Sequence, residues 1–174
     1  MNLNTKRFLA VAAIGLTLTG LSAGEAVAQT SDTKSPTLTV TLKDALSLTM
    51  NVGSVNLTFE TVDHYRNGVT TTVNNQFTVT SNKPYNLTVR ALGDLTGGPG
   101  TDIPVSNISV AGTNTPDISG TVASLSQTDQ SLAAAAPAVQ NKNISLLYTA
   151  AGSADFLKPA GNYATTLTFT ATQN

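Results

Sequence analysis

Apolar and polar residues alternate along much of the chain after residue 36, and a period of two is typical of half-buried β-strands. Leu38, Val40 and Leu42 share one phase, with threonines at the positions between them. The same phase continues to Met50 and shifts by one residue after Gly53, as it does at a turn or a bulge. The first part of the fold is therefore predicted to be extended.

Short alternating segments recur as far as the C-terminus, separated by turn residues. They cover residues 55–59, 77–79, 85–91, 103–110, 118–125, 144–148 and 163–171. This spacing predicts an all-β protein, an immunoglobulin-like Greek-key β-sandwich of about 7–9 strands with at most one short helix. Asn67-Gly68 indicates a type I′ hairpin within 62–73. The Ala-rich segment 132–139 is the one helix candidate, and Pro137 would end it early.

The N-terminus has the order of a secretory signal peptide. Lys6 and Arg7 precede an apolar run over 8–21, and Ala26-Val27-Ala28 matches a cleavage site before Gln29. We therefore expect export to the periplasm, the cell surface or the medium. The expected organisation is a cleaved leader over 1–28, a flexible N-terminus over 29–35 and a single β-sandwich domain over 36–174.

Composition narrows the range of partners. The chain has nine basic and ten acidic residues, of which the leader holds two and one, so the mature net charge is about −2. This weak, mixed charge does not suit a nucleic-acid partner. No second apolar run follows the leader, so we expect no integral membrane span in the mature chain. The chain has no cysteine, which excludes a disulfide framework and a lipid anchor on cysteine.

Reactive groups are scarce. His64 is the only histidine, and no serine stands in a Gly-x-Ser-x-Gly setting. Asp63, its neighbour on an expected strand, would point to the opposite face and could not orient the His64 ring. We therefore expect no enzyme activity, no catalytic residue, no cofactor and no metal centre. The Gly-rich loop between Asp94 and Asp102 leaves two interpretations open, a long turn or a calcium loop.

Aromatic residues leave a binding role open. The chain has no Trp, but Tyr65 near the expected hairpin tip and Tyr85 after a turn could stack on a sugar ring. Tyr148 and Tyr163 fit core or corner positions better. A carbohydrate- or peptidoglycan-binding surface module, with a surface glycan as its partner, is therefore the alternative function.

Three segments carry a resemblance to known secreted proteins: Pro36–Leu42, Phe77–Val89 and Leu157–Thr170, the last with Pro159-Ala160-Gly161 before a terminal strand. Together they resemble the major subunits of bacterial fimbriae of the alternate chaperone–usher type. They also resemble WxL-type cell-surface domains. The Trp motif of WxL domains and the cysteine pair of ordinary chaperone–usher pilins are both missing from this sequence.

The fimbrial resemblance implies assembly by strand addition. In such fimbriae a subunit lacks one strand, and the N-terminal extension of the next subunit fills its groove by β-augmentation. Leu38, Val40 and Leu42 are the candidate strand-addition residues, and the alternative is that residues 36–42 begin the first strand of their own domain. We therefore expect a secreted or cell-surface structural or adhesive protein. Its expected protein partners are further copies of itself, other fimbrial subunits or a periplasmic chaperone.

Overall fold

The structure, a computed structural model, describes residues 32–113, 118 and 120–174. The predicted leader over 1–28 and the first residues of the 29–35 segment lie outside the described residues. The chain divides into two units, Met1–Val40 and Thr41–Asn174. Every helix and strand that the structure describes belongs to the second unit, and the described residues of the first, 32–40, form neither.

Five antiparallel strands form the larger sheet, in the order β1-β2-β7-β4-β5. They are β1 (Leu46–Met50), β2 (Val69–Ser81), β4 (Ile108–Gly112), β5 (Thr121–Val122) and β7 (Val139–Ala150). β2 and β7 are the longest strands and pair along most of their length, with irregularities after Val73 and after Val79. β1 has β2 as its one neighbour, so it forms an edge of this sheet.

Three antiparallel strands form the smaller sheet, in the order β6-β3-β8. They are β3 (Tyr85–Ala91), β6 (Gln130–Ala136) and β8 (Leu167–Gln173). β8 pairs with β3 in unbroken register from Leu167 to Gln173 and forms an edge of this sheet. The described residues therefore form two antiparallel sheets, which confirms the prediction of an all-β protein.

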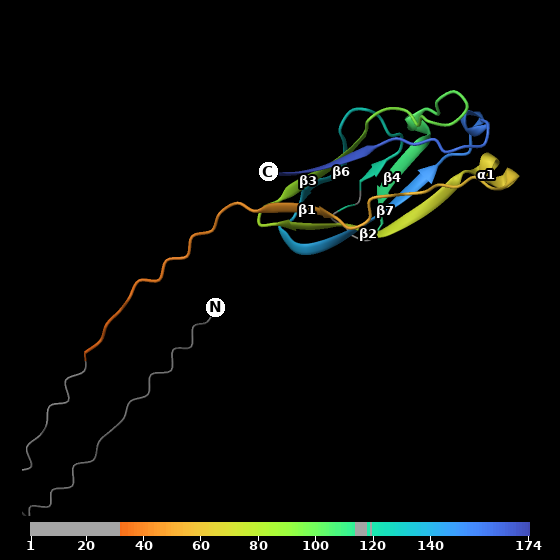
Figure 1. Cartoon of the computed structure of the whole chain (residues 1–174). Helices are drawn as coiled ribbons and strands as arrows, with labels where there is room; N and C mark the ends of the chain where they lie inside the picture. Colours follow the sequence, from red (N-terminus) through yellow and green to blue (C-terminus); the bar gives the residue numbers. More distant parts are fainter. Residues whose placement is uncertain (1–31, 114–117, 119) are drawn as a thin grey trace, which may run out of the picture. The chain divides into compact units, whose positions relative to one another are not determined.

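The core lies between the two sheets (Figure 1). Phe77 of β2 and Phe169 of β8 meet across the layers, with ring centroids 4.6 Å apart. The largest fully buried side chains are Tyr85, Tyr148, Phe77, Leu87, Ile118, Leu125, Leu132, Ile144, Leu146, Val79, Val89 and Val110. Burial alternates along β3, where Tyr85, Leu87 and Val89 are buried while the residues between them are half-buried or exposed, as the period of two predicts.

The predicted hairpin within 62–73 is wrong, because residues Val62–Asn67 form the helix α1. Thr61 caps this helix by accepting a hydrogen bond from the backbone N–H of His64, and Gly68 ends it with a φ of 84°. The Asn-Gly pair therefore closes a helix instead of joining two strands, a use of left-handed glycine that the dipeptide alone does not distinguish. Two short 3-10 helices, η1 (Val105–Asn107) and η2 (Ala154–Phe156), complete the elements.

The predicted helix within 132–139 is also wrong, because most of the Ala-rich segment belongs to β6. Leu132, Ala133 and Ala136 are buried there and pack into the common core. Pairing with β3 and burial against the second sheet outweigh the helix propensity of alanine, which is worth only tenths of a kcal/mol per residue.

Candidate functional site

A groove opens between the free edges of the two sheets. It encloses about 910 Å³ and is lined mainly by apolar side chains. One wall runs from Met50, the last residue of β1, to Phe59. The other runs from Lys158 to Phe169, which lies within β8. Both walls are sheet edges or their extensions, so the groove lies where an additional strand could pair with backbone on either side.

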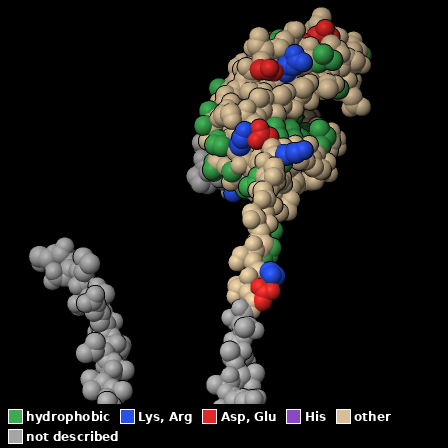
Figure 2. All heavy atoms as spheres, turned by 90° about the vertical axis from the view of Figure 1, so that its left-hand side faces the viewer, with side chains coloured by type: hydrophobic (Ala, Val, Ile, Leu, Met, Phe, Trp, Pro, Cys, Tyr) green, Lys and Arg blue, Asp and Glu red, His purple; other side chains and the backbone are tan. Residues whose placement is uncertain are grey.

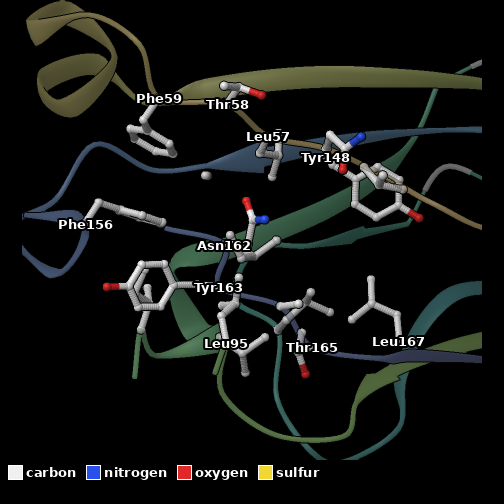
Figure 3. Close-up of a pocket in the computed structure, with 18 of the residues that line it drawn as sticks. Leu57, Thr58, Phe59, Leu95, Tyr148, Phe156, Asn162, Tyr163, Thr165 and Leu167 are labelled. Atoms are coloured by element: carbon white, nitrogen blue, oxygen red, sulfur yellow. The ribbon is translucent and has the colours of Figure 1, made fainter. Parts of the chain in front are cut away.

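The first wall is an extended segment held against β2. The backbone N–H of Val52 donates to the carbonyl of Gln76 at 3.3 Å, and the Thr71 hydroxyl donates to the carbonyl of Asn56 at 3.1 Å. Val55, Leu57 and Phe59 are half-buried, while the residues between them are exposed. Figure 3 shows Leu57 and Phe59 on the side of the cavity opposite Thr165 and Leu167. The shift of the alternation after Gly53 in the sequence therefore coincides with the alternating burial of this wall.

The second wall is fixed to the Gly-rich loop. Ala164 and Thr96 exchange two backbone hydrogen bonds, at 2.8 and 2.9 Å. The Thr165 hydroxyl donates to the carbonyl of Gly93 at 2.8 Å. These bonds hold Ala164 and Thr165 to the Gly-rich loop. Further along the segment, Leu167 and Phe169 are partly exposed and line the groove.

The floor of the groove carries one buried polar pair. The Tyr148 hydroxyl donates to the side-chain oxygen of Gln76 at 2.8 Å, and both residues line the groove. Burial raises the pKa of Tyr148 to about 12, since the phenolate would lose its hydration. The Tyr148 hydroxyl therefore keeps its proton to higher pH than an ordinary tyrosine does.

The end of the groove nearest α1 is aromatic. The rings of Phe59 and Phe156 stack with centroids 4.5 Å apart, and Phe59 also meets Tyr65 at 5.3 Å. The Tyr163 hydroxyl donates to the carbonyl of Pro159 at 3.0 Å. Lys158 is the one charged side chain among the lining residues, and its ammonium donates to the Thr101 hydroxyl at 2.6 Å. An acidic or nucleic-acid ligand would find little complementary charge here.

The groove begins at Met50 and Phe169, and beyond this end lie the side chains of Asn82 and Gln173, which we call the amide clamp. Asn82 accepts from the backbone N–H of Ala45 at 2.9 Å and donates through its amide nitrogen to the carbonyl of Lys43 at 2.8 Å. Gln173, near the end of β8, donates to the carbonyl of Ala45 at 2.8 Å. The clamp thus ties the start of β1 to the end of β8, and Figure 1 places both ends opposite α1.

The candidate strand-addition residues are exposed. Leu38, Val40 and Leu42 have exposed fractions of 89%, 74% and 85%. Residues 36–42 form no strand. Three large apolar side chains of one phase are therefore exposed to solvent in the single chain. Figure 2 shows few charged side chains on the face it presents, where backbone and side chains that are neither charged nor hydrophobic form most of the surface.

The residues proposed for sugar binding do not come together. Tyr85 is 1% exposed, so its ring packs in the core and cannot stack on a ligand. Tyr65 is half-buried and contacts Phe59 at the aromatic end of the groove. The core position expected for Tyr148 is confirmed, with an exposed fraction of 2%.

The residues considered as catalytic or metal-binding candidates have local structural roles. The His64 ring accepts a hydrogen bond on Nδ1 from the backbone N–H of Glu60, at 3.0 Å. Asp94 accepts from the backbone N–H of Val105 at 2.9 Å, which ties the start of the Gly-rich loop to η1. Among the described residues, no three acidic or histidine side chains cluster as metal ligands would.

No family model matches the chain, and the search of curated proteins gives no match. The fimbrial and WxL resemblances therefore stay predictions. Over residues 32–113, 118 and 120–174, no helix is long and apolar enough to cross a membrane.

Proposed function

We propose that this protein is an exported structural or adhesive subunit of a bacterial cell surface that assembles by strand addition. Residues 36–42 of one copy fill the groove of another, as in the fimbrial subunits that the sequence resembles. An immunoglobulin-like Greek-key arrangement and a periplasmic chaperone that covers the groove before assembly belong to the same proposal. The observation that supports it most is an apolar groove between two free sheet edges, in a chain that also carries an unpaired alternating apolar segment.

The groove and the segment match in length and chemistry. The first wall from Met50 to Phe59 spans about 30 Å at roughly 3.3 Å per residue, and residues 36–42 span about 20 Å. Leu38, Val40 and Leu42 point to one face of an extended chain, where the half-buried side chains of both walls would cover them. Their burial contributes about 5–8 kcal/mol of gross transfer free energy. The cost of association and of ordering the segment offsets part of this gain.

A second copy is a better source of the segment than the same chain. The amide clamp holds Lys43 and Ala45, so a chain that folds back must turn before residue 43. If a two-residue turn used residues 41 and 42, residue 40 would lie beside Lys43 and residue 33 beside Met50. Leu38 would then lie level with Ala45, which is outside the groove. Another copy is free of this restriction.

A glycan-binding module is the weaker alternative. It relied on two exposed tyrosine rings, and Tyr85 is buried. The aromatic residues Phe59, Tyr65 and Phe156 contact one another at the groove end, where they form part of the apolar wall and not an open platform.

The proposal is tested by replacing the three apolar residues of the segment. The mature chain (residues 29–174) is compared with the variant Leu38→Ser, Val40→Ser and Leu42→Ser by size-exclusion chromatography with light scattering and by electron microscopy. Removal of about 5 kcal/mol of burial corresponds to a weakening of association by three to four powers of ten. The wild type is expected to form multimers and the variant to elute as a monomer.

The matched control changes the other face of the same segment. Thr37→Ser, Thr39→Ser and Thr41→Ser alter three neighbouring side chains of the opposite phase and remove no large apolar group. This control is expected to assemble like the wild type. A wild-type protein that stays monomeric at high concentration would overturn the proposal.

A further inference from the structure

Met50 carries the only sulfur atom of the mature chain. The sequence has no cysteine and two methionines, and the other methionine, Met1, begins the predicted leader. Met50 is the last residue of β1, and its exposed fraction is 56%. An exported chain therefore presents one exposed thioether to the oxidising environment outside the cytoplasm.

The side chain of Met50 lines one end of the groove. Met50 pairs with the buried Phe77 of β2, but it lies on the edge strand, where it lines the groove together with Gly53. A Cβ atom added at Gly53 would lie 3.4 Å from the Met50 sulfur, so the thioether packs over the backbone at this position. The sulfur therefore belongs to the surface of the groove and not to the cluster of buried core residues.

A chain segment lying in the groove would cover Met50. Residues 32–42 in extended form span about 36 Å at roughly 3.3 Å per residue, which exceeds the first wall of about 30 Å. The unbranched, polarisable thioether of methionine adapts well to apolar side chains of irregular shape. Its sulfoxide does not, because the added oxygen is polar and would need a hydrogen-bond partner when it is buried.

We propose that Met50 is a modification site for peroxides and that its oxidation blocks strand addition to the copy that carries it. This inference rests on the proposed function. Hydrogen peroxide transfers one oxygen atom to the sulfur: the O–O bond breaks, the S–O bond forms, the thioether is oxidised to the sulfoxide, and the peroxide is reduced to one molecule of water. Methionine sulfoxide reductases reverse this modification, so the block is reversible.

The modification distinguishes free copies from assembled ones. In a free copy the thioether is exposed, and the susceptibility of methionine to oxidants rises with exposure. In an assembled copy the added segment covers it. An oxidant therefore stops the addition of new copies and leaves the chains that already exist intact.

The test uses an acceptor that cannot donate its own segment, the mature chain with Leu38→Ser, Val40→Ser and Leu42→Ser. The probe is a fluorescent synthetic peptide of residues 32–43, which contains no methionine, and binding is measured by fluorescence anisotropy. After treatment of the acceptor with hydrogen peroxide, mass spectrometry of its peptides is expected to place one added oxygen on Met50. The oxidised acceptor is expected to bind the probe about tenfold to a hundredfold more weakly, the cost of burying a polar group without a partner.

The matched control is the same acceptor with Met50→Leu, a substitution that nearly conserves the volume of the side chain. Its affinity for the probe is expected to be the same before and after peroxide treatment. Equal affinity of the oxidised and untreated Met50 proteins, or an equal loss in the Met50→Leu control, would overturn this inference and leave strand addition intact. A probe that binds no form of the acceptor would mean that the proposed function has failed, and this inference with it.

A second measurement compares the rates at which Met50 is oxidised. In assembled wild-type protein the rate is expected to be at least tenfold lower than in the acceptor variant, because the added segment covers the sulfur. Equal rates would overturn the inference, since Met50 would then lie outside the contact. The oxidised acceptor is expected to keep its circular dichroism spectrum, and unfolding on oxidation would also overturn the inference, because the sulfur would then belong to the packing of the fold.

Discussion

The titration of Tyr148, on the groove floor, tests whether this residue is buried. Its hydroxyl donates to Gln76, its exposed fraction is 2%, and burial raises its pKa to about 12. An unfolded tyrosine has a pKa of about 10. Between pH 10 and 12 the unfolded chain therefore loses the Tyr148 proton while the folded chain keeps it. A group with a raised folded pKa contributes stability that is complete below pH 10 and is lost as the pH rises toward 12.

The size of this loss follows from the shift. Two pH units at about 1.36 kcal/mol each give an upper bound of about 2.7 kcal/mol. Tyr148→Phe removes the titration and keeps the ring. At pH 7 it is expected to lower the free energy of unfolding by about 1 kcal/mol, the cost of a lost hydrogen bond. At pH 12 the variant is expected to be as stable as the wild type, or more stable.

The assay is urea unfolding at pH 7, 10, 11 and 12, followed by circular dichroism, because the chain has no Trp. Both proteins carry the three serine substitutions at 38, 40 and 42, so that association does not contribute to stability. All other residues are the same in both proteins, so their contributions cancel in the difference. Two stability curves that run parallel from pH 10 to 12 would refute the burial of Tyr148.

Two further substitutions test the packing that supports the groove. Phe77→Ala is expected to lower the free energy of unfolding by about 3–5 kcal/mol, measured by urea unfolding, because its buried ring packs on Phe169; a loss under about 1 kcal/mol would contradict this contact. Gly68→Ala is expected to cost about 2 kcal/mol or more, since Gly68 has a φ of 84° and an added Cβ would collide with the carbonyl of Ala150. Gly93→Ala, where the added Cβ meets no atom within 4 Å, is its control, and equal melting temperatures for the two variants would count against the structure at α1.

The sequence pattern predicted the parts of the groove that depend on local alternation. The phase shift after Gly53 marked Val55, Leu57 and Phe59, which form the first wall. The same period of two predicted the terminal strand that became β8, with Leu167 and Phe169 facing the groove. In both cases one face of an extended segment is partly buried, which requires apolar residues at every second position.

Contacts between distant segments could not be predicted in this way. Asn82 and Gln173 are 91 residues apart, and amide side chains in a turn and at a C-terminus carry no pattern that would pair them. The second wall near Ala164 is extended because it bridges to Thr96 of the Gly-rich loop. The Ala-rich segment became a strand for the same reason, since its pairing with β3 depends on the rest of the fold.

Hydrogen exchange of the backbone amides of residues 37–41 is the most direct test of strand addition. In assembled mature protein these amides are expected to exchange at least a hundredfold more slowly than in the variant with serine at 38, 40 and 42, because they pair with the walls of another copy. Exchange at the rate of an unstructured peptide within assembled particles would contradict the account. Equal protection in isolated monomers would contradict it as well, since the segment would then be bound within its own chain.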